Sequence, residues 1–325
     1  MKIAYLLSHR PDFLKRLVAY TGPDPLILSA DKSGRYDPTD LAKLADVDAL
    51  MASNEPVTEQ VLAAAPRVKI IQRFGVGYEK LDLDAAARRG IPCCNLAGVN
   101  KASVAEHGML LLLALARNLM TSHALTQKGL WGEARLSMHG SFEMVGKTLG
   151  IFGLGNTGFE LAKRARVFGM RILYNDIREI SPENIAAVEA TFREKTALLA
   201  EADMVSVNVN FTPSAVNLLD ASAISLMKPG ALLVCCARGG VIDEKALAEA
   251  LNEGRLAGAG LDVFSEEPIP VESPLLQAKN LITTPHMAGV TQEARDRNFE
   301  WAFENVRRVV EDGDPPQWVV NGVAP

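Results

Sequence analysis

Segments with the apolar character of β-strands alternate with helix-like segments along almost the whole chain. Successive parallel strands must be joined by a crossover, which is usually a helix, so this order predicts parallel sheets with right-handed connections. In the first part of the chain, strands are expected at 2–7, 26–28, 49–52, 68–73 and 92–95. A second and clearer alternation begins with the strand expected at 148–152. The pattern therefore predicts an α/β protein.

Length and an interruption of the pattern predict two domains. The chain has 325 residues, and about 150 residues per domain is the usual prior. A long apolar helix expected at 103–117 and a stretch at 119–147 without clear periodicity, which we interpret as an arm, separate the two alternations. A final helix, expected at 291–311, would return to the first domain. We predict two doubly wound parallel-sheet domains, comprising residues 1–99 with 291–325 and residues 100–290.

Charge and composition argue against several partners. The chain has 34 basic and 39 acidic residues and a net charge of -5, whereas binding to nucleic acid needs a basic face. The N-terminus lacks the layout of a signal peptide, and the apolar run 109–116 is too short to span a membrane, so a cytoplasmic location is expected. The four cysteines form two adjacent pairs, which favours buried strand residues in a reducing compartment and predicts no metal site.

A glycine motif predicts the cofactor. Gly153, Gly155 and Gly158 follow an apolar strand and open a helix, and Asp176 ends the next strand, 18 residues after Gly158. In dinucleotide-binding Rossmann domains these glycines permit a tight turn, a close approach of the pyrophosphate, and close helix–strand packing. Asp176 would accept hydrogen bonds from the ribose hydroxyls and repel a 2′-phosphate. NAD is therefore favoured over NADP, although Arg178 lies close by in the sequence.

Two side chains after later strands suit the reduction of a keto acid. Arg238 follows the strand expected at 231–236 and could bind a carboxylate in a bidentate manner. His286 follows the strand expected at 281–284 and could exchange a proton near neutral pH. Open α/β sheets place their sites at such strand ends. A structural ion pair and a structural histidine are the competing interpretations.

Acidic residues near these positions offer further roles. Glu267 would stabilise the imidazolium of His286 if the two side chains met, and Glu266 competes with it on sequence grounds. Asp262 ends the strand expected at 257–263 and could accept a hydrogen bond from the nicotinamide amide, or could cap its strand. We expect the cofactor-binding residues to be Gly153, Gly155, Asn156, Thr157, Gly158, Asp176, Asn208, Cys236 and Asp262.

Several ordered motifs resemble one family. The segments GLGNTG (153–158), ARGGVID (237–243), GLDVFSEEP (260–268) and TPHMAG (284–289) are similar to those of the D-isomer-specific 2-hydroxyacid dehydrogenases. The upstream segments FGVGY (74–78), VNKASVAEHG (99–108) and GKTLGIFGLG (146–155) are similar too. The resemblance extends from about Val57 to Val290, and its phosphoglycerate dehydrogenase-like branch looks nearest.

The resemblance implies an activity and a set of roles. It implies NAD-dependent interconversion of a small D-2-hydroxy acid and its 2-keto acid, with Arg238, Glu267 and His286 as catalytic residues. It also implies that backbone N–H groups at Val76 and Gly77 bind the substrate carboxylate. The domain of residues 1–99 and 291–325 would be a flavodoxin-like substrate domain, and that of residues 100–290 the Rossmann NAD-binding domain. The protein would be a homodimer whose 119–147 arm embraces the partner.

The resemblance leaves the substrate and one alternative class open. The loop around Asn54, expected to face the substrate, has no obvious basic anchor for a phosphate in its sequence, so 3-phosphoglycerate, glyoxylate and hydroxypyruvate all remain candidates. Members often carry His-Thr-Pro or His-Val-Pro where this chain has Asn208-Val209-Asn210, which leaves the adenine-side contacts open. The same fold also serves dinucleotide-sensing corepressors, which act as dimeric regulators.

Overall fold

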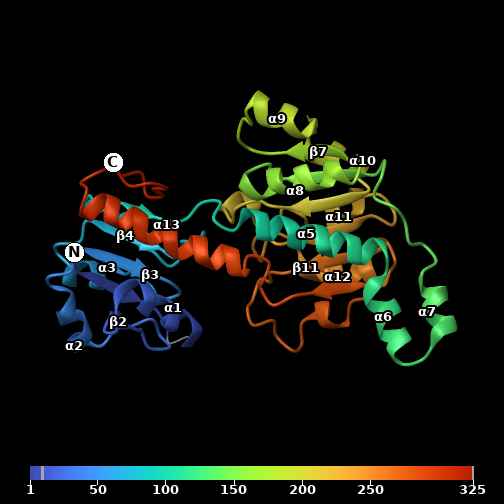
Figure 1. Ribbon diagram of the computed structural model, residues 1–325. Coiled ribbons are helices and arrows are strands. Elements are labelled where there is room, and N and C mark those ends of the chain that lie inside the picture. The colour runs from blue at the N-terminus through green and yellow to red at the C-terminus, as the bar shows by residue number, and fades with distance from the viewer. Residues whose placement is uncertain (9–10, 324–325) are drawn as a thin grey trace. The chain divides into compact units, whose positions relative to one another are not determined.

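The computed structural model describes residues 1–8 and 11–323, which divide into two compact units (Figure 1). Unit 1 comprises residues 1–100 and 292–325, and unit 2 comprises residues 101–291. Each unit is built on its own sheet, and every strand pair in both sheets is parallel. The two α/β domains with parallel sheets that the sequence predicts are thereby confirmed.

Unit 1 contains a five-stranded sheet with helices on both faces. The strand order is β2-β1-β3-β4-β5. Its strands are β1 (Ile3–Leu6), β2 (Leu26–Leu28), β3 (Ala49–Ala52), β4 (Ile70–Arg73) and β5 (Cys93–Cys94). Its helices are α1 (Pro11–Thr21), α2 (Pro38–Leu41), α3 (Glu59–Ala64), α4 (Leu83–Arg88) and α13 (Gln292–Val310), with a 3₁₀ turn at Ala42–Leu44.

Alternating side chains of these strands feed two separate cores. Ala4 and Leu6 of β1 pack in the core beneath α2, α3 and α4, whereas Tyr5 of the same strand packs in the core beneath α1 and α13. Because successive strand residues point to opposite faces, a sheet covered on both sides needs apolar residues at every position. Most strands of this sheet are continuous apolar runs in the sequence because both of its faces are buried.

Unit 2 contains a seven-stranded sheet in the order β12-β11-β10-β9-β6-β7-β8. The chain moves outward from β6 to β7 and β8, then returns to β9 on the other side of β6, so the order reverses between β6 and β9. The strands are β6 (Thr148–Phe152), β7 (Arg171–Asn175), β8 (Ala190–Phe192), β9 (Met204–Val207), β10 (Leu232–Cys235), β11 (Gly258–Leu261) and β12 (Leu281–Thr283).

Helices cover both faces of this sheet as well. One core lies beneath α5, α8 and α9, and the other lies beneath α10, α11 and α12. The helices of unit 2 are α5 (Lys101–Ala116), α6 (Leu119–Gln127), α7 (Trp131–Ser137), α8 (Asn156–Val167), α9 (Pro182–Val188), α10 (Lys195–Glu201), α11 (Ala221–Leu226) and α12 (Glu244–Asn252). Short 3₁₀ turns occupy Pro213–Ala215 and Pro274–Gln277.

Several helices begin at a side chain that caps them. The carboxylate of Asp220 accepts a hydrogen bond from the N–H of Ala223, and that of Asp243 accepts one from Ala246. Such caps satisfy N–H groups that the first helical turn leaves unpaired. They explain why short segments such as α11, which the apolar pattern does not predict, are helical.

The expected arm at 119–147 contains two helices, α6 and α7. Their sequences show little periodicity because α6 has no buried residue and α7 buries only Ala134. Within residues 1–8 and 11–323, no single helix is long and apolar enough to cross a membrane; by length and composition alone, only the bent pair α5–α6 would be. Half of the 16 residues of α5 are buried.

The cysteines behave as the sequence suggests. Cys93, Cys94 and Cys235 are buried, Cys236 is half-buried, and all four are free thiols. Burial raises the pKa of the Cys93 and Cys94 thiols to about 12. These side chains therefore act as small neutral residues of the sheet at neutral pH.

Candidate active site

The predicted site residues of unit 2 gather at one edge of its sheet. Strands β10, β11 and β12 are parallel neighbours, so the residues that follow them emerge at the same edge. Arg238 follows β10, Asp262 follows β11, and His286 follows β12. The glycine turn after β6 and Asp176 after β7 belong to the same carboxyl edge. Ligands of open α/β sheets bind at this edge, close to the reversal of strand order.

The glycine turn leaves no room for side chains. Gly153 has a φ of +85°, and a Cβ there would lie 2.8 Å from the backbone oxygen of Asn208. A Cβ on Gly158 would lie 2.0 Å from the backbone oxygen of Gly153. The turn is therefore tight and the helix packs directly on it, as the motif predicts.

The N-terminus of α8 can receive a phosphate group. The helix begins at Asn156, and its N-cap residue, Gly155, provides no side-chain hydrogen bond. The first N–H groups of a helix and its dipole attract anions, and Asn156, Thr157 and Gly158 supply those groups. The cradle that lacks side chains and the uncapped helix thus fit the pyrophosphate of a dinucleotide.

Asp176 is engaged from two sides. Its Oδ2 accepts a hydrogen bond from the N–H of Leu154 at 2.9 Å, and its Oδ1 accepts one from the N–H of Arg178 at 2.9 Å. The guanidinium of Arg178 also contacts the carboxylate, with Nε 3.3 Å from Oδ1, and the Asp176 side chain is only 4% exposed. Arg178 reaches the glycine turn too, since its Nη2 lies 2.9 Å from the position of a Cβ on Gly155. The carboxylate is thus in the predicted place, but Arg178 covers it.

His286 and Glu267 form a hydrogen-bonded pair. The imidazole Nδ1 lies 2.7 Å from Oε2 of Glu267, and the imidazole is half exposed. The other carboxylate oxygen, Oε1, accepts the N–H of Phe264 at 3.0 Å, which orients the glutamate. An ionised carboxylate only accepts hydrogen bonds, so Nδ1 carries a proton and Nε2 is left to exchange one. Of the two candidate glutamates, it is Glu267 that contacts the histidine.

Arg238 lies on a turn that packs against the loop of Glu267. A Cβ on Gly239 would lie 1.8 Å from the backbone oxygen of Phe264, so only glycine permits this approach. The Glu244 carboxylate at the start of α12 accepts the N–H of Ser265 at 2.6 Å and ties the same loop to the turn. The guanidinium of Arg238 donates to the backbone oxygen of Ala237.

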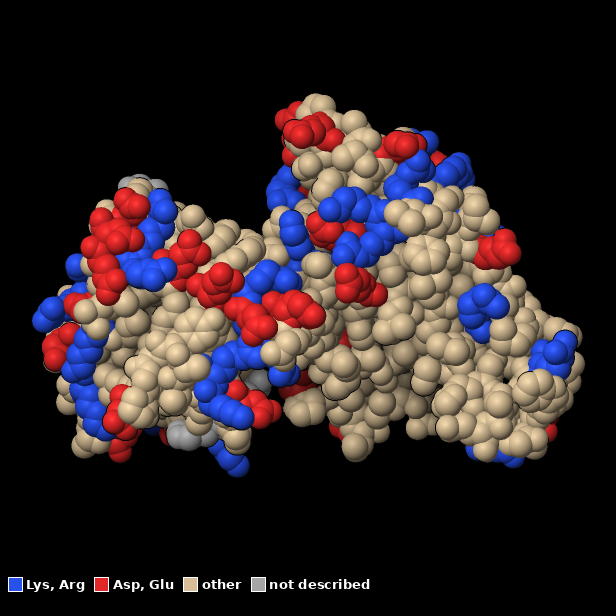
Figure 2. Space-filling model, viewed as in Figure 1, with Lys and Arg blue, Asp and Glu red and all other residues tan. Residues whose placement is uncertain are grey.

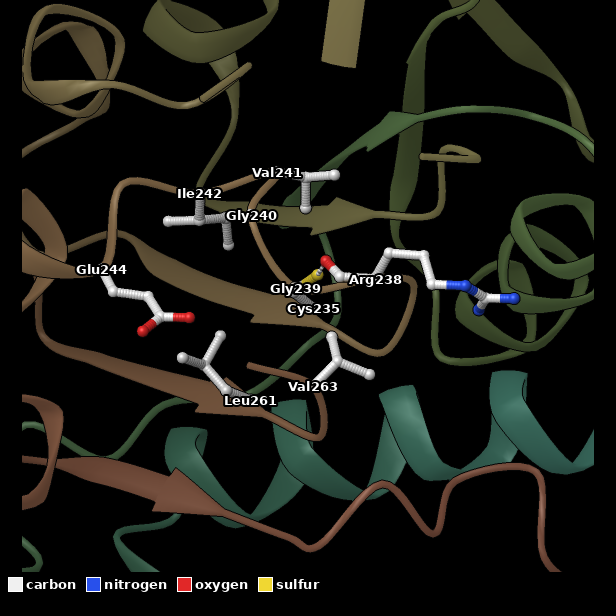
Figure 3. A pocket seen from close by; sticks show the side chains of 9 residues that line it. All are labelled: Cys235, Arg238, Gly239, Gly240, Val241, Ile242, Glu244, Leu261 and Val263. Carbon is white, nitrogen blue, oxygen red and sulfur yellow. Dashed lines mark hydrogen bonds between the residues drawn. The ribbon is translucent and has the colours of Figure 1, made fainter. Parts of the chain in front are cut away.

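A small pocket lies under the turn of Arg238. Figure 3 shows Glu244 at one end of the pocket and the Arg238 side chain extending away from it. Apolar side chains, including Val241, Leu261 and Val263, line the space between. The pocket lies between this turn and β11, and the guanidinium of Arg238 lies outside it.

The remaining predicted cofactor residues lie on the same edge. Asn208 follows β9, and its side-chain amide donates to Oγ of Ser206 at 3.0 Å. Cys236 follows β10, and burial raises the pKa of its thiol well above the usual value. The thiol is therefore neutral at neutral pH and is no nucleophile. Asp262 is fully buried, and its carboxylate binds the loop of His286.

The predicted substrate residues Val76, Gly77 and Asn54 belong to unit 1. Val76 and Gly77 follow β4, and the amide of Asn95 donates to the backbone oxygen of Val76 at 2.8 Å. The preceding Phe74 anchors this turn by packing against Phe13 and Phe299.

Two cations contact the Asn54 loop, which sequence reasoning missed. Nη2 of Arg73 lies 3.4 Å from Oδ1 of Asn54, and the Lys80 ammonium donates to the Asn54 backbone oxygen at 2.8 Å. Neither cation belongs to the loop itself. The sequence does not show that these cations lie beside Asn54, because their position depends on the pairing of β3 with β4, which brings the ends of these strands together.

A dinucleotide turn on a doubly wound sheet, with an imidazole–carboxylate pair on the same edge, is the arrangement of a nicotinamide-dependent dehydrogenase. Residues 109–288 match the family profile described as D-isomer specific 2-hydroxyacid dehydrogenase, NAD binding domain. The chain belongs to this family. It is an NAD-dependent 2-hydroxyacid dehydrogenase with a Rossmann domain, as the motifs predict.

The similarity to known proteins extends over most of the chain. It is 39% identical to a glyoxylate reductase of Korarchaeum cryptofilum over 86% of this chain and 84% of the relative. It is 40% identical to a D-3-phosphoglycerate dehydrogenase of Methanocaldococcus jannaschii, where the match covers 86% of this chain and 53% of the relative. The apo crystal structure of D-mandelate dehydrogenase of Rhodotorula graminis is 26% identical, has a TM-score of 0.87, and is covered over 99% of its length.

Proposed function

We propose that the protein reduces a short 2-keto acid, with glyoxylate or hydroxypyruvate as the leading candidates, to the D-2-hydroxy acid. The hydrogen-bonded pair of His286 and Glu267 is the observation that carries this proposal, because reduction of a carbonyl needs a proton donor of fixed orientation. The glyoxylate reductase relatives, of which the chain covers most of the length, support the choice of substrate.

The residues of unit 2 divide the work of the reaction. When bound, NADH supplies the hydride. His286 holds a proton on Nε2 and delivers it to the carbonyl oxygen of the substrate, while Glu267 keeps Nδ1 protonated and stabilises the imidazolium. Arg238 binds the substrate carboxylate. In the oxidative direction the neutral imidazole accepts the proton. The roles predicted for Val76, Gly77 and Asn54 in carboxylate binding remain proposals.

A panel of 2-keto acids tests the function. We expect oxidation of NADH by glyoxylate or hydroxypyruvate at rates of at least about 1 s⁻¹, within the range of ordinary enzymes. The product should be the D isomer where it is chiral. Binding of NADH without turnover of any keto acid would contradict the proposal and would favour a dinucleotide-sensing regulator of the corepressor type.

A phosphorylated substrate is the second candidate, favoured by Arg73 and Lys80. Both cations contact the Asn54 loop, which is predicted to face the substrate. Guanidinium and ammonium groups are common phosphate ligands. Including phosphohydroxypyruvate and 3-phosphoglycerate in the panel decides the matter, because kcat/KM for the phosphorylated compound should then exceed that for hydroxypyruvate.

Asp176 is proposed to set the preference for NAD over NADP. We expect Asp176→Ala to lower the ratio of kcat/KM for NADH to that for NADPH by about 10-fold or more, because the carboxylate no longer repels a 2′-phosphate and Arg178 becomes available to bind it. Arg178→Ala is the matched control, and it should leave NADPH disfavoured. A ratio unchanged in Asp176→Ala would remove this residue from the role.

We propose that the protein is a homodimer held by the arm formed of α6 and α7. Trp131, Leu136 and Met120 are 66%, 63% and 56% exposed, and the region of α6 and α7 carries few charges in Figure 2. Exposed apolar patches of this kind mark protein–protein contacts. A second copy of the chain is the occupant that the family resemblance implies. A cytoplasmic location also stays a prediction.

Sedimentation velocity tests the dimer. We expect the parent protein to sediment as a dimer and Trp131→Glu combined with Leu136→Glu to sediment as a monomer, because two buried charges would each cost several kcal/mol at the interface. Val167→Glu changes another exposed apolar residue outside the arm and should remain dimeric. A monomeric parent, or a dimeric double variant, would contradict the role of the arm.

A further inference from the structure

The loop that carries His286 is fastened to the buried carboxylate of Asp262. Oδ1 of Asp262 accepts the N–H of Met287 at 2.9 Å, and Oδ2 accepts the N–H of Ala288 at 2.8 Å. The N–H of His286 donates to the backbone oxygen of Asp262 at 2.8 Å. These bonds hold three successive residues of the loop. They matter because His286 has a φ of +51°, a conformation that a residue other than glycine keeps only when its surroundings impose it.

A third donor on Asp262 comes from Thr284. Its hydroxyl donates to Oδ1 of Asp262 at 2.5 Å, and the same hydroxyl oxygen lies 3.0 Å from Nε2 of His107 on α5. A threonine hydroxyl has one proton, and that proton points to the carboxylate. The imidazole of His107 must therefore donate its Nε2–H to Thr284. The hydrogen bonds run in one direction, from His107 through Thr284 to Asp262.

We propose that Thr284 and His107 are positioning residues for His286, acting through the carboxylate of Asp262. This inference depends on the proposed catalytic role of His286. The charge-assisted bonds to Asp262 fix the carboxylate, which in turn fixes the loop amides and the unusual backbone angle of His286. Because the backbone of His286 is held in one conformation, its imidazole ring stays within hydrogen-bonding distance of Glu267.

The chain of hydrogen bonds is built from groups that solvent hardly reaches. Asp262 is fully buried, the His107 side chain is only 11% exposed, and Thr284 between them is half-buried. All its members come from unit 2, where α5 packs against β10 and β11. A buried carboxylate needs partners, and removing one partner weakens the hold on the others. Simple packing of the Thr284 methyl group would not need the hydroxyl, so a valine separates the two interpretations.

Amide hydrogen exchange of the free protein tests the positioning without any cofactor. We expect Thr284→Val to speed exchange in the segment 284–290 about 10-fold, and Thr284→Ser, which keeps the hydroxyl, to exchange at the parent rate. Thr148→Val is the matched control. It removes the hydroxyl of a buried threonine, which accepts a bond from Arg171 at the opposite edge of the sheet, and should leave segment 284–290 unchanged. Equal exchange in Thr284→Val and the parent would overturn the inference.

Steady-state kinetics gives the second readout. We expect Thr284→Val to lower kcat about 10- to 100-fold while KM for the keto acid and Kd for NADH change less than about 3-fold. Thr284→Ser should restore kcat, and Thr148→Val should keep it. A Thr284→Ser variant as slow as Thr284→Val would show that the hydroxyl is not the cause. A loss of NADH affinity as large as the loss of kcat would assign the network to dinucleotide binding instead.

His107 supplies an independent variant should Thr284→Val fail to fold. We expect His107→Leu to lower kcat about 3- to 10-fold and His107→Gln, whose amide can still donate, to recover most of it. Unchanged kcat in His107→Leu would remove His107 from the network. The proposed function fails separately: if His286→Ala keeps its activity, His286 is not the acid, whereas activity lost in His286→Ala but kept in Thr284→Val rejects only the positioning role.

Discussion

His286→Ala is expected to lower kcat by about 10²- to 10⁴-fold, the usual contribution of a general acid. The side chain is the partner of Glu267, and in the proposed mechanism it holds the transferable proton on Nε2. Alanine removes the proton donor but leaves the glycine turn, the N-terminus of α8 and Asp176 in place. Stopped-flow and steady-state assays of NADH oxidation measure the loss.

Binding of NADH provides the control for this variant. Its Kd, measured by fluorescence titration, should stay within about 3-fold of the parent value, and the melting temperature should change by only a few degrees because the imidazole is half exposed. Turnover close to that of the parent would exclude His286 as the acid. A large loss of NADH affinity would instead place the imidazole in dinucleotide binding.

Gly239→Ala should have the second largest effect. The new methyl group would lie 1.8 Å from the backbone oxygen of Phe264 and 2.6 Å from the N–H nitrogen of Ser265, so the turn of Arg238 and the loop of Glu267 must separate. We expect kcat/KM to fall about 100-fold, since displacements near 1 Å cost that much. Overpacking should also lower the free energy of unfolding by about 1–3 kcal/mol.

Gly254→Ala separates the loss of activity from the loss of stability. Gly254 has a φ of +73°, but no atom lies within 4 Å of a Cβ placed there, so alanine is strained without a clash. It should cost about 1 kcal/mol in stability and leave kcat/KM unchanged. If Gly239→Ala keeps its activity, the close packing of the two loops is not needed for catalysis.

The pattern of apolar residues was sufficient to predict the architecture. Strands buried on both faces, such as β6 and β10, appear as continuous apolar runs. The glycine motif after β6, between a strand and a helix, is typical of a dinucleotide-binding turn. Short elements were missed for a physical reason. Helices α10 and α11 and strand β8 have only three to seven residues, too few for a period to emerge.

The site was harder to predict where it depends on contacts distant in sequence. The residue pattern by itself left Glu266 and Glu267 open and only the family resemblance implied Glu267, whereas the contact between Glu267 and the His286 imidazole separates the two in the structure. Nor could the sequence show that Arg178 covers Asp176, or that His107 connects to Asp262 through Thr284. Each of these contacts needs a side-chain direction that only the folded loop defines.

The hydrogen bond from the Phe264 N–H to the Glu267 carboxylate has an energetic consequence. One carboxylate oxygen accepts the N–H of Phe264 and the other contacts the imidazole, so bonds within unit 2 alone orient the His286–Glu267 pair. The conformational entropy of these two side chains is lost once, when the chain folds, and not in every catalytic cycle. Variants that loosen the 264–267 turn should therefore have a lower kcat even where their Kd for the dinucleotide is unchanged.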